Sequence, residues 1–74
     1  MKRHETGQYA YAGRYAIETD SGALLAGGGV TVQRPRLYET EEAVREAVAA
    51  MDPAKWRAVS LTPVLLVWRA DLWK

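Results

Sequence analysis

The chain has 74 residues, a formal charge of +1 at pH 7 and no cysteine. One small domain is therefore expected over 1–74, with neither a disulfide framework nor a thiolate metal site. No segment approaches the ~20 apolar residues of a membrane span, and the start MKRHETGQYA lacks the apolar run of a signal peptide. We therefore expect a cytoplasmic protein that does not contact the membrane.

The charges are segregated along the chain. Residues 1–38 carry five basic and three acidic groups, residues 39–52 carry one basic and five acidic groups, and residues 53–74 carry four basic and one acidic group. An acidic middle segment therefore lies between two basic flanks, and a partner of either charge could bind.

The first predicted strand begins at Tyr9. Residues 1–7 are polar and are expected to be frayed. From Tyr9 the chain alternates with period two, which predicts a strand with a bulge or close approach at Gly13. One side of this strand would carry Tyr9, Tyr11, Tyr15 and Ile17. The sequence Asp20-Ser21-Gly22 then predicts a hairpin turn.

The segment that returns from this turn reads ALLAGGGVTV over residues 23–32. Two arrangements fit it: residues 23–26 pair directly with the first strand, or residues 20–29 form one long loop. Beta-branching and alternation predict a strand over Val30–Arg34. Because Pro35 lacks an N–H donor, this part of the strand is expected to lie at a sheet edge or to leave the ladder there. A phosphate-binding loop would need a helix after its glycines. A strand follows here, so Gly27, Gly28 and Gly29 indicate a turn or bulge.

A helix is predicted over Glu41–Met51, with Thr40 as its N-cap and acidic residues in its first turn. Its buried stripe would be Val44, Ala47, Val48 and Met51. Asp52-Pro53 ends this helix and can start a short helical turn over 53–56, and the last strand covers Val59–Trp68. The predicted fold is α+β, in β-β-α-β order, with a small antiparallel sheet and one main helix on one face.

Catalysis is poorly supported by these residues. His4 is the only histidine and lies in the segment expected to be frayed, so no catalytic residue, metal ligand or cofactor-binding residue is predicted. The glutamates of the helix have the spacing of a solvated face. The tyrosines could stack on single-stranded nucleic acid, near Arg14, Arg34 and Arg36, but a chain this small needs them for its core.

The last strand carries the strongest indication of a binding surface. Val64 to Trp68 is apolar on both faces, whereas a sheet with one helix covers only one face. Either Leu65 and Val67, or Val64, Leu66 and Trp68, would then meet an end of this chain, a second copy or another protein. The exposed patch is expected to centre on Leu66 and Trp68. Tryptophan and arginine, adjacent at Trp68-Arg69, are enriched at binding hot spots.

The hairpin from Tyr9 to Arg34, the acidic helix and the closing strand together resemble the compact accessory proteins of phages and mobile elements, including anti-CRISPR proteins. This resemblance covers nearly the whole chain at the level of architecture. It implies a non-enzymatic, stoichiometric inhibitor in the host bacterial cell that docks on a CRISPR effector complex and blocks target DNA. The expected contacts are Glu42 and Glu46, or else Arg34, Arg36, Leu66 and Trp68.

Two alternative functions remain open on the sequence. The chain could be a small nucleic-acid-binding module that uses its basic strand face, although the near-neutral charge makes direct nucleic-acid binding unexpected. It could also be a structural homodimer, assembled through the apolar last strand.

Overall fold

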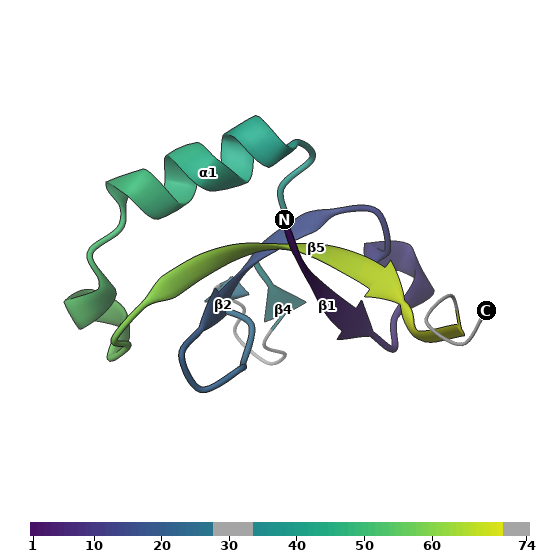
Figure 1. Cartoon of the computed structure of the whole chain (residues 1–74), viewed down its shortest axis with the longest axis horizontal. Helices are drawn as coiled ribbons and strands as arrows, with labels where there is room; N and C mark the ends of the chain where they lie inside the picture. The colour runs from purple at the N-terminus through teal and green to yellow at the C-terminus, as the bar shows by residue number, and fades with distance from the viewer. Residues whose placement is uncertain (28–33, 71–74) are drawn as a thin grey trace.

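The computed structural model describes residues 1–27 and 34–70. Its main sheet is built around β5 (Leu61–Trp68), which lies between β1 (Lys2–Thr6) and β2 (Tyr15–Thr19). β2 is antiparallel to β5 and β1 is parallel to it. Figure 1 shows β5 crossing the middle of the molecule, with the helix α1 (Glu41–Ala50) above it.

The expectation that residues 1–7 are frayed is wrong. Residues 2–6 form β1, in register with Val64–Trp68 of β5. The α+β class with one main helix is confirmed, but β1 makes the sheet mixed rather than purely antiparallel. The segment KRHET contains no apolar residue. Its polarity therefore resembles that of a solvated end of the chain, and the hydrophobic pattern could not reveal it as a strand.

The predicted strand from Tyr9 begins only at Tyr15, and the continuous tyrosine stripe is wrong. Tyr9–Tyr11 forms a short 3-10 turn, η1, and Gly13 has a φ of 85°. Glycine adopts this left-handed conformation without a steric penalty. The chain therefore changes direction before β2, and Tyr11 and Tyr15 pack into two different clusters on opposite sides of the sheet.

The turn at residues 20–22 is confirmed. Gly22 has a φ of 85°, and its N–H donates to the Thr19 carbonyl at 3.0 Å. The returning segment pairs directly with β2, because the Leu25 N–H donates to the Ile17 carbonyl at 2.7 Å. It continues as β3 (Ala26–Gly27), antiparallel to β4 (Arg34–Pro35). The other predicted strand positions, 30–33, and Gly28 and Gly29 lie outside the described residues.

Helix α1 begins and packs as its sequence predicts. The Thr40 Oγ1 accepts a hydrogen bond from the Ala43 N–H at 3.1 Å, as an N-cap should. Val44 is fully buried, and the other members of the stripe pack around it: Ala47, Val48 and Met51. The turn η2 (Pro53–Trp56) follows, capped by the Asp52 carboxylate, which accepts from the Ala54 N–H at 3.0 Å.

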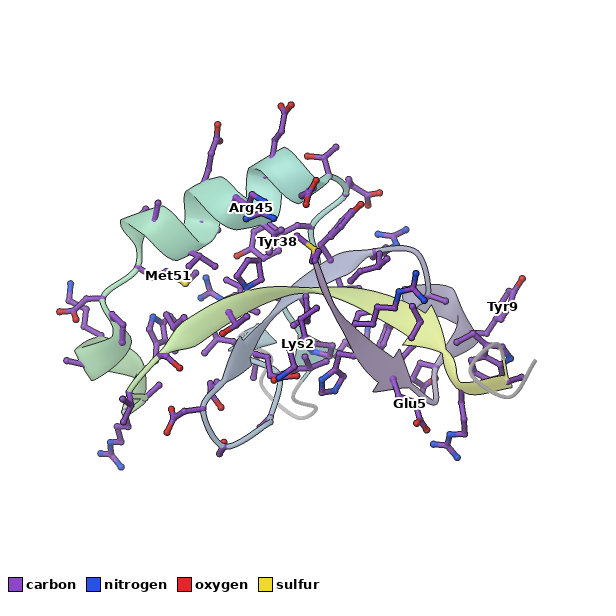
Figure 2. The ribbon with its side chains drawn as sticks, viewed as in Figure 1. Lys2, Glu5, Tyr9, Tyr38, Arg45 and Met51 are labelled. Carbon is purple, nitrogen blue, oxygen red and sulfur yellow. The ribbon has the colours of Figure 1, made fainter. Side chains whose placement is uncertain are left out.

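The core lies on both sides of the sheet. On the helix side, Ile17 and Val44 pack together, and Figure 2 shows Tyr38 and Met51 between the helix and the sheet. On the other side, Val64 and Leu66 are fully buried. This second cluster includes Ala16 and is covered by Tyr11, Leu24 and Leu37. Both faces of β5 are therefore covered within one chain.

Pro63 lies inside the central strand, where proline is normally unfavourable. It pairs with Ile17 of β2. The Ile17 carbonyl points away from β5 and accepts from the Leu25 N–H. Ile17 and Pro63 are therefore a pair without hydrogen bonds between them, and the backbone groups of Pro63 point toward the β1 side. The pairing with β1 begins only at Val64. No described strand therefore lies where it would accept a hydrogen bond from an N–H at position 63.

None of the helices among residues 1–27 and 34–70 is long and apolar enough to cross a membrane.

We predict that the Val64→Ala substitution lowers the free energy of unfolding by about 2 kcal/mol, because it removes two buried methyl groups and leaves a cavity. The matched control is Val59→Ala, since Val59 is 85% exposed. That variant should stay within about 0.5 kcal/mol of the wild type. Urea unfolding of the three proteins measures both values, and equal losses in the two variants would contradict the described core.

Candidate functional site

Three ionisable side chains meet on the face of the sheet opposite the helix. Glu18 of β2 is buried, with a side chain that is 8% exposed. Its Oε1 accepts from the Lys2 Nζ at 2.5 Å, and its Oε2 lies 2.6 Å from the His4 Nδ1. Figure 2 shows Lys2 beneath the sheet, on the side away from α1. Lys2 and His4 come from β1, so the carboxylate links the two outer strands across β5.

This arrangement keeps Glu18 ionised. The hydrogen bond from Lys2 lowers the pKa of the Glu18 carboxyl below its ordinary value. Burial acts in the opposite direction, and the hydrogen bond to His4 and the charges of Lys2 and His4 lower the pKa further. Because an ionised carboxylate only accepts hydrogen bonds, the His4 Nδ1 carries the proton and donates it. Both carboxylate oxygens are engaged, so the cluster fastens β1 to the sheet.

Sequence reasoning missed this cluster. His4 was expected in a frayed segment, which is wrong because it lies in β1 and contacts Glu18. The one available signal was the alternation of Lys2, His4 and Thr6, which places all three side chains on one face of a strand. All three side chains are polar, so they do not indicate a buried strand, and no local sequence pattern shows that Lys2 and His4 contact Glu18.

The outer face of α1 is acidic. Glu41 and Arg45 form an i,i+4 ion pair at 3.0 Å. Glu42 and Glu46 are exposed and form no ion pair with any residue in 1–27 or 34–70. These two carboxylates are one helical turn apart, and Figure 2 shows oxygen-tipped side chains projecting from the side of the helix that faces away from the sheet. The helix therefore presents unneutralised negative charge to solvent.

The three arginines singled out in the sequence differ in their surroundings. Arg14 pairs with Glu39 at 2.5 Å, which neutralises charge at the start of the helix. The Arg36 guanidinium stacks over the Trp56 ring at 4.9 Å, in a half-buried position, whereas Arg34 is exposed on β4. A cation over an indole ring is held by the electrostatics of that ring. Of these three arginines, two already have partners within the chain.

The two proposed contact residues on the last strand, Leu66 and Trp68, differ in exposure. Leu66 is fully buried, so the expectation that it lies at the centre of an exposed patch is wrong. Its place is covered by residues from the turn η1 and from the segments beside β3 and β4. Trp68 is half-buried and meets the exposed Tyr9 edge to face, with ring centroids 5.5 Å apart. Trp68 thus remains accessible at the end of β5.

Within the part of the chain that the structure describes, no group of three or more carboxylate or imidazole side chains is placed to hold a metal ion. No protein-family model matches the chain, and comparisons with curated proteins and with solved structures find no match.

We predict that the Glu18→Gln substitution destabilises the fold by about 1–2 kcal/mol at neutral pH, because a neutral amide oxygen replaces the ionised acceptor of the hydrogen bonds from Lys2 and His4. It should also change the pH dependence of stability. A carboxyl whose pKa is lowered in the folded state contributes stability above its unfolded pKa, and this contribution is lost as the pH falls through the folded pKa. The ordinary value is 4.5, so the loss occurs below about pH 4.5.

Thermal unfolding between pH 2 and pH 7 checks this prediction. The acid-induced loss of stability should be smaller in Glu18→Gln than in the wild type. Glu42→Gln is the control, since this exposed carboxylate has no ion-pair partner among the described residues. A wild-type acid profile that Glu18→Gln leaves unchanged would show that the carboxylate does not hold β1.

Proposed function

We propose that this protein is non-enzymatic and acts by binding a nucleic-acid-handling complex through the outer face of α1, as a stoichiometric inhibitor of the anti-CRISPR type. The observation that carries the proposal is the exposed pair Glu42 and Glu46, which has no ion-pair partner among the described residues. The proposed partner is a CRISPR effector complex of the host cell, as the architectural resemblance implies.

The chemistry of the acidic face supports this choice of partner. A groove that binds DNA is lined with lysine and arginine, and these side chains bind carboxylates as well as phosphates. A rigid helix that presents two carboxylates one turn apart can occupy such a groove in place of the nucleic acid. The opposite stripe of α1 is anchored in the core by Val44, so the acidic face is held on a fixed element.

The substitutions Glu42→Gln and Glu46→Gln, made together, should weaken capture of a purified effector complex about tenfold at low salt, because charged interface residues steer association. The difference should shrink as salt rises. The melting temperature should stay near that of the wild type, since exposed charges contribute little to stability. Binding of both proteins at two salt concentrations measures this effect.

The matched control adds the same change in charge elsewhere. Ala54 and Ser60 are exposed and lie outside α1, so the double variant Ala54→Lys, Ser60→Lys should bind as the wild type does. Equal weakening by both double variants would show that overall charge, not the helix face, governs binding. Absence of wild-type binding to every effector complex tested would overturn the proposed partner.

We also predict no submicromolar binding to DNA or RNA at physiological salt. Nonspecific binding of basic proteins has dissociation constants of roughly 1–100 µM under these conditions, and the charge here is only +1. Fluorescence anisotropy with random oligonucleotides checks this. Tight, salt-sensitive binding that is lost in an Arg34→Ala, Arg36→Ala double variant would favour the nucleic-acid-binding module instead.

A further inference from the structure

The main sheet has one open edge. Its strand order is β1-β5-β2, and among the described residues β5 is the only strand paired with β1. The other outer strand is covered, because the Leu25 N–H bonds to Ile17, and Tyr15 and Tyr38 exchange backbone hydrogen bonds at 2.8 and 2.9 Å. An edge strand offers unpaired N–H and C=O groups to an incoming strand. β1 is therefore the place where the sheet can be extended.

The backbone of β1 directs two residues toward this edge. Leu66 bonds to Arg14 and Gly13, on the β2 side, so its neighbours Leu65 and Val67 direct their backbone groups toward β1. The register partners of Leu65 and Val67 are Arg3 and Glu5. In a parallel ladder a residue bonds to the two residues that flank its partner, so Leu65 and Val67 bond to Lys2, His4 and Thr6. Arg3 and Glu5 direct their N–H and C=O groups outward.

The two outward residues carry opposite charges, and both are exposed. If a second copy of β1 lies antiparallel with the twofold axis at His4, Arg3 of each copy faces Glu5 of the other. Both are outward residues, so each such pair exchanges both backbone hydrogen bonds. The next register in one direction that keeps outward residues opposite each other pairs Arg3 with Arg3. The next such register in the other direction pairs Glu5 with Glu5. One register alone is therefore self-complementary in charge.

We propose that the protein forms a twofold-symmetric homodimer in which β1 pairs antiparallel with β1 of a second copy, with Arg3 opposite Glu5. The two three-stranded sheets then form one continuous sheet. Charged side chains on an edge usually oppose pairing. Here their signs alternate, so the charges attract in the register that the backbone allows, and opposite charges across a strand pair are stabilising.

The other side chains of β1 are compatible with this pairing. The Glu5 Oε1 already binds the Arg69 Nε at 2.8 Å, and the second carboxylate oxygen can accept from Arg3 of the other copy. His4 lies on the axis, and its ring is held by Glu18 of its own chain. Lys2 faces Thr6 of the second copy, so no lysine or arginine of β1 faces another lysine or arginine of β1.

Charge reversal at these two positions tests the register directly. Sedimentation equilibrium of the wild type over a concentration series should give twice the monomer mass of 8.2 kDa at the upper end. Arg3→Glu alone places two glutamates opposite each other, and Glu5→Arg alone places two arginines opposite each other. Each single variant should be monomeric over the same series. The double variant Arg3→Glu, Glu5→Arg restores opposite charges and should dimerise again.

An equimolar mixture of the two single variants provides the sharpest comparison, because one copy then presents only glutamates and the other only arginines. The mixture should form a heterodimer although neither component dimerises alone. Circular dichroism establishes that each variant is folded, and Glu42→Gln with Glu46→Gln should leave dimerisation unchanged. A monomeric wild type, or dimers that persist equally in the single variants, would overturn the proposal.

Discussion

The structure depends on one requirement, which is that β5 must be covered on both faces. One face of β5 carries Val64 and Leu66, and the other carries Leu61. These side chains are apolar, and a short chain has few other segments that can cover them. The helix covers one face. The other face is covered by Tyr11, Leu24 and Leu37, which come from segments that are not in the main sheet. The small domain therefore has two core clusters, one on each face of the main sheet.

Because β5 is central, a strand is needed on each side of it, and the two strands are held by different forces. β2 shares apolar side chains with both clusters, through Ala16 and Ile17. β1 contributes no apolar side chain, and Glu18 holds it through Lys2 and His4. A carboxylate in this position is stabilised only while both partners remain. The cluster contains the residue types of an acid/base site, and its contacts connect β1 to β2.

The polar surface then divides into two regions with different consequences. The outer face of α1 presents Glu42 and Glu46 without ion-pair partners among the described residues, which suits a cationic partner. The edge of β1 alternates Arg3 and Glu5, which suits a second copy of the same strand. The two regions lie on different elements, α1 and β1.

The sequence by itself determined the elements whose signals are local. The cap at Thr40, the stripe around Val44, the turn at residues 20–22 and the cap at Asp52 follow from side chains within a few residues of each other. The apolar last strand and the α+β class followed from the same local patterns. The acidic outer face of the helix was also visible, since a helix with one buried stripe must expose the residues between.

Only the tertiary structure decided which strands pair and what covers them. β1 and β5 are separated by most of the chain, and the polar segment KRHET gains its place from Glu18, a contact that no local periodicity records. Gly13 turned the tyrosine pattern away from a strand, because a positive φ there sends Tyr11 and Tyr15 to opposite sides. Leu66 is buried because Tyr11, Leu24 and Leu37 pack over its cluster. Burial depends on which distant segments pack together, and local spacing cannot specify that.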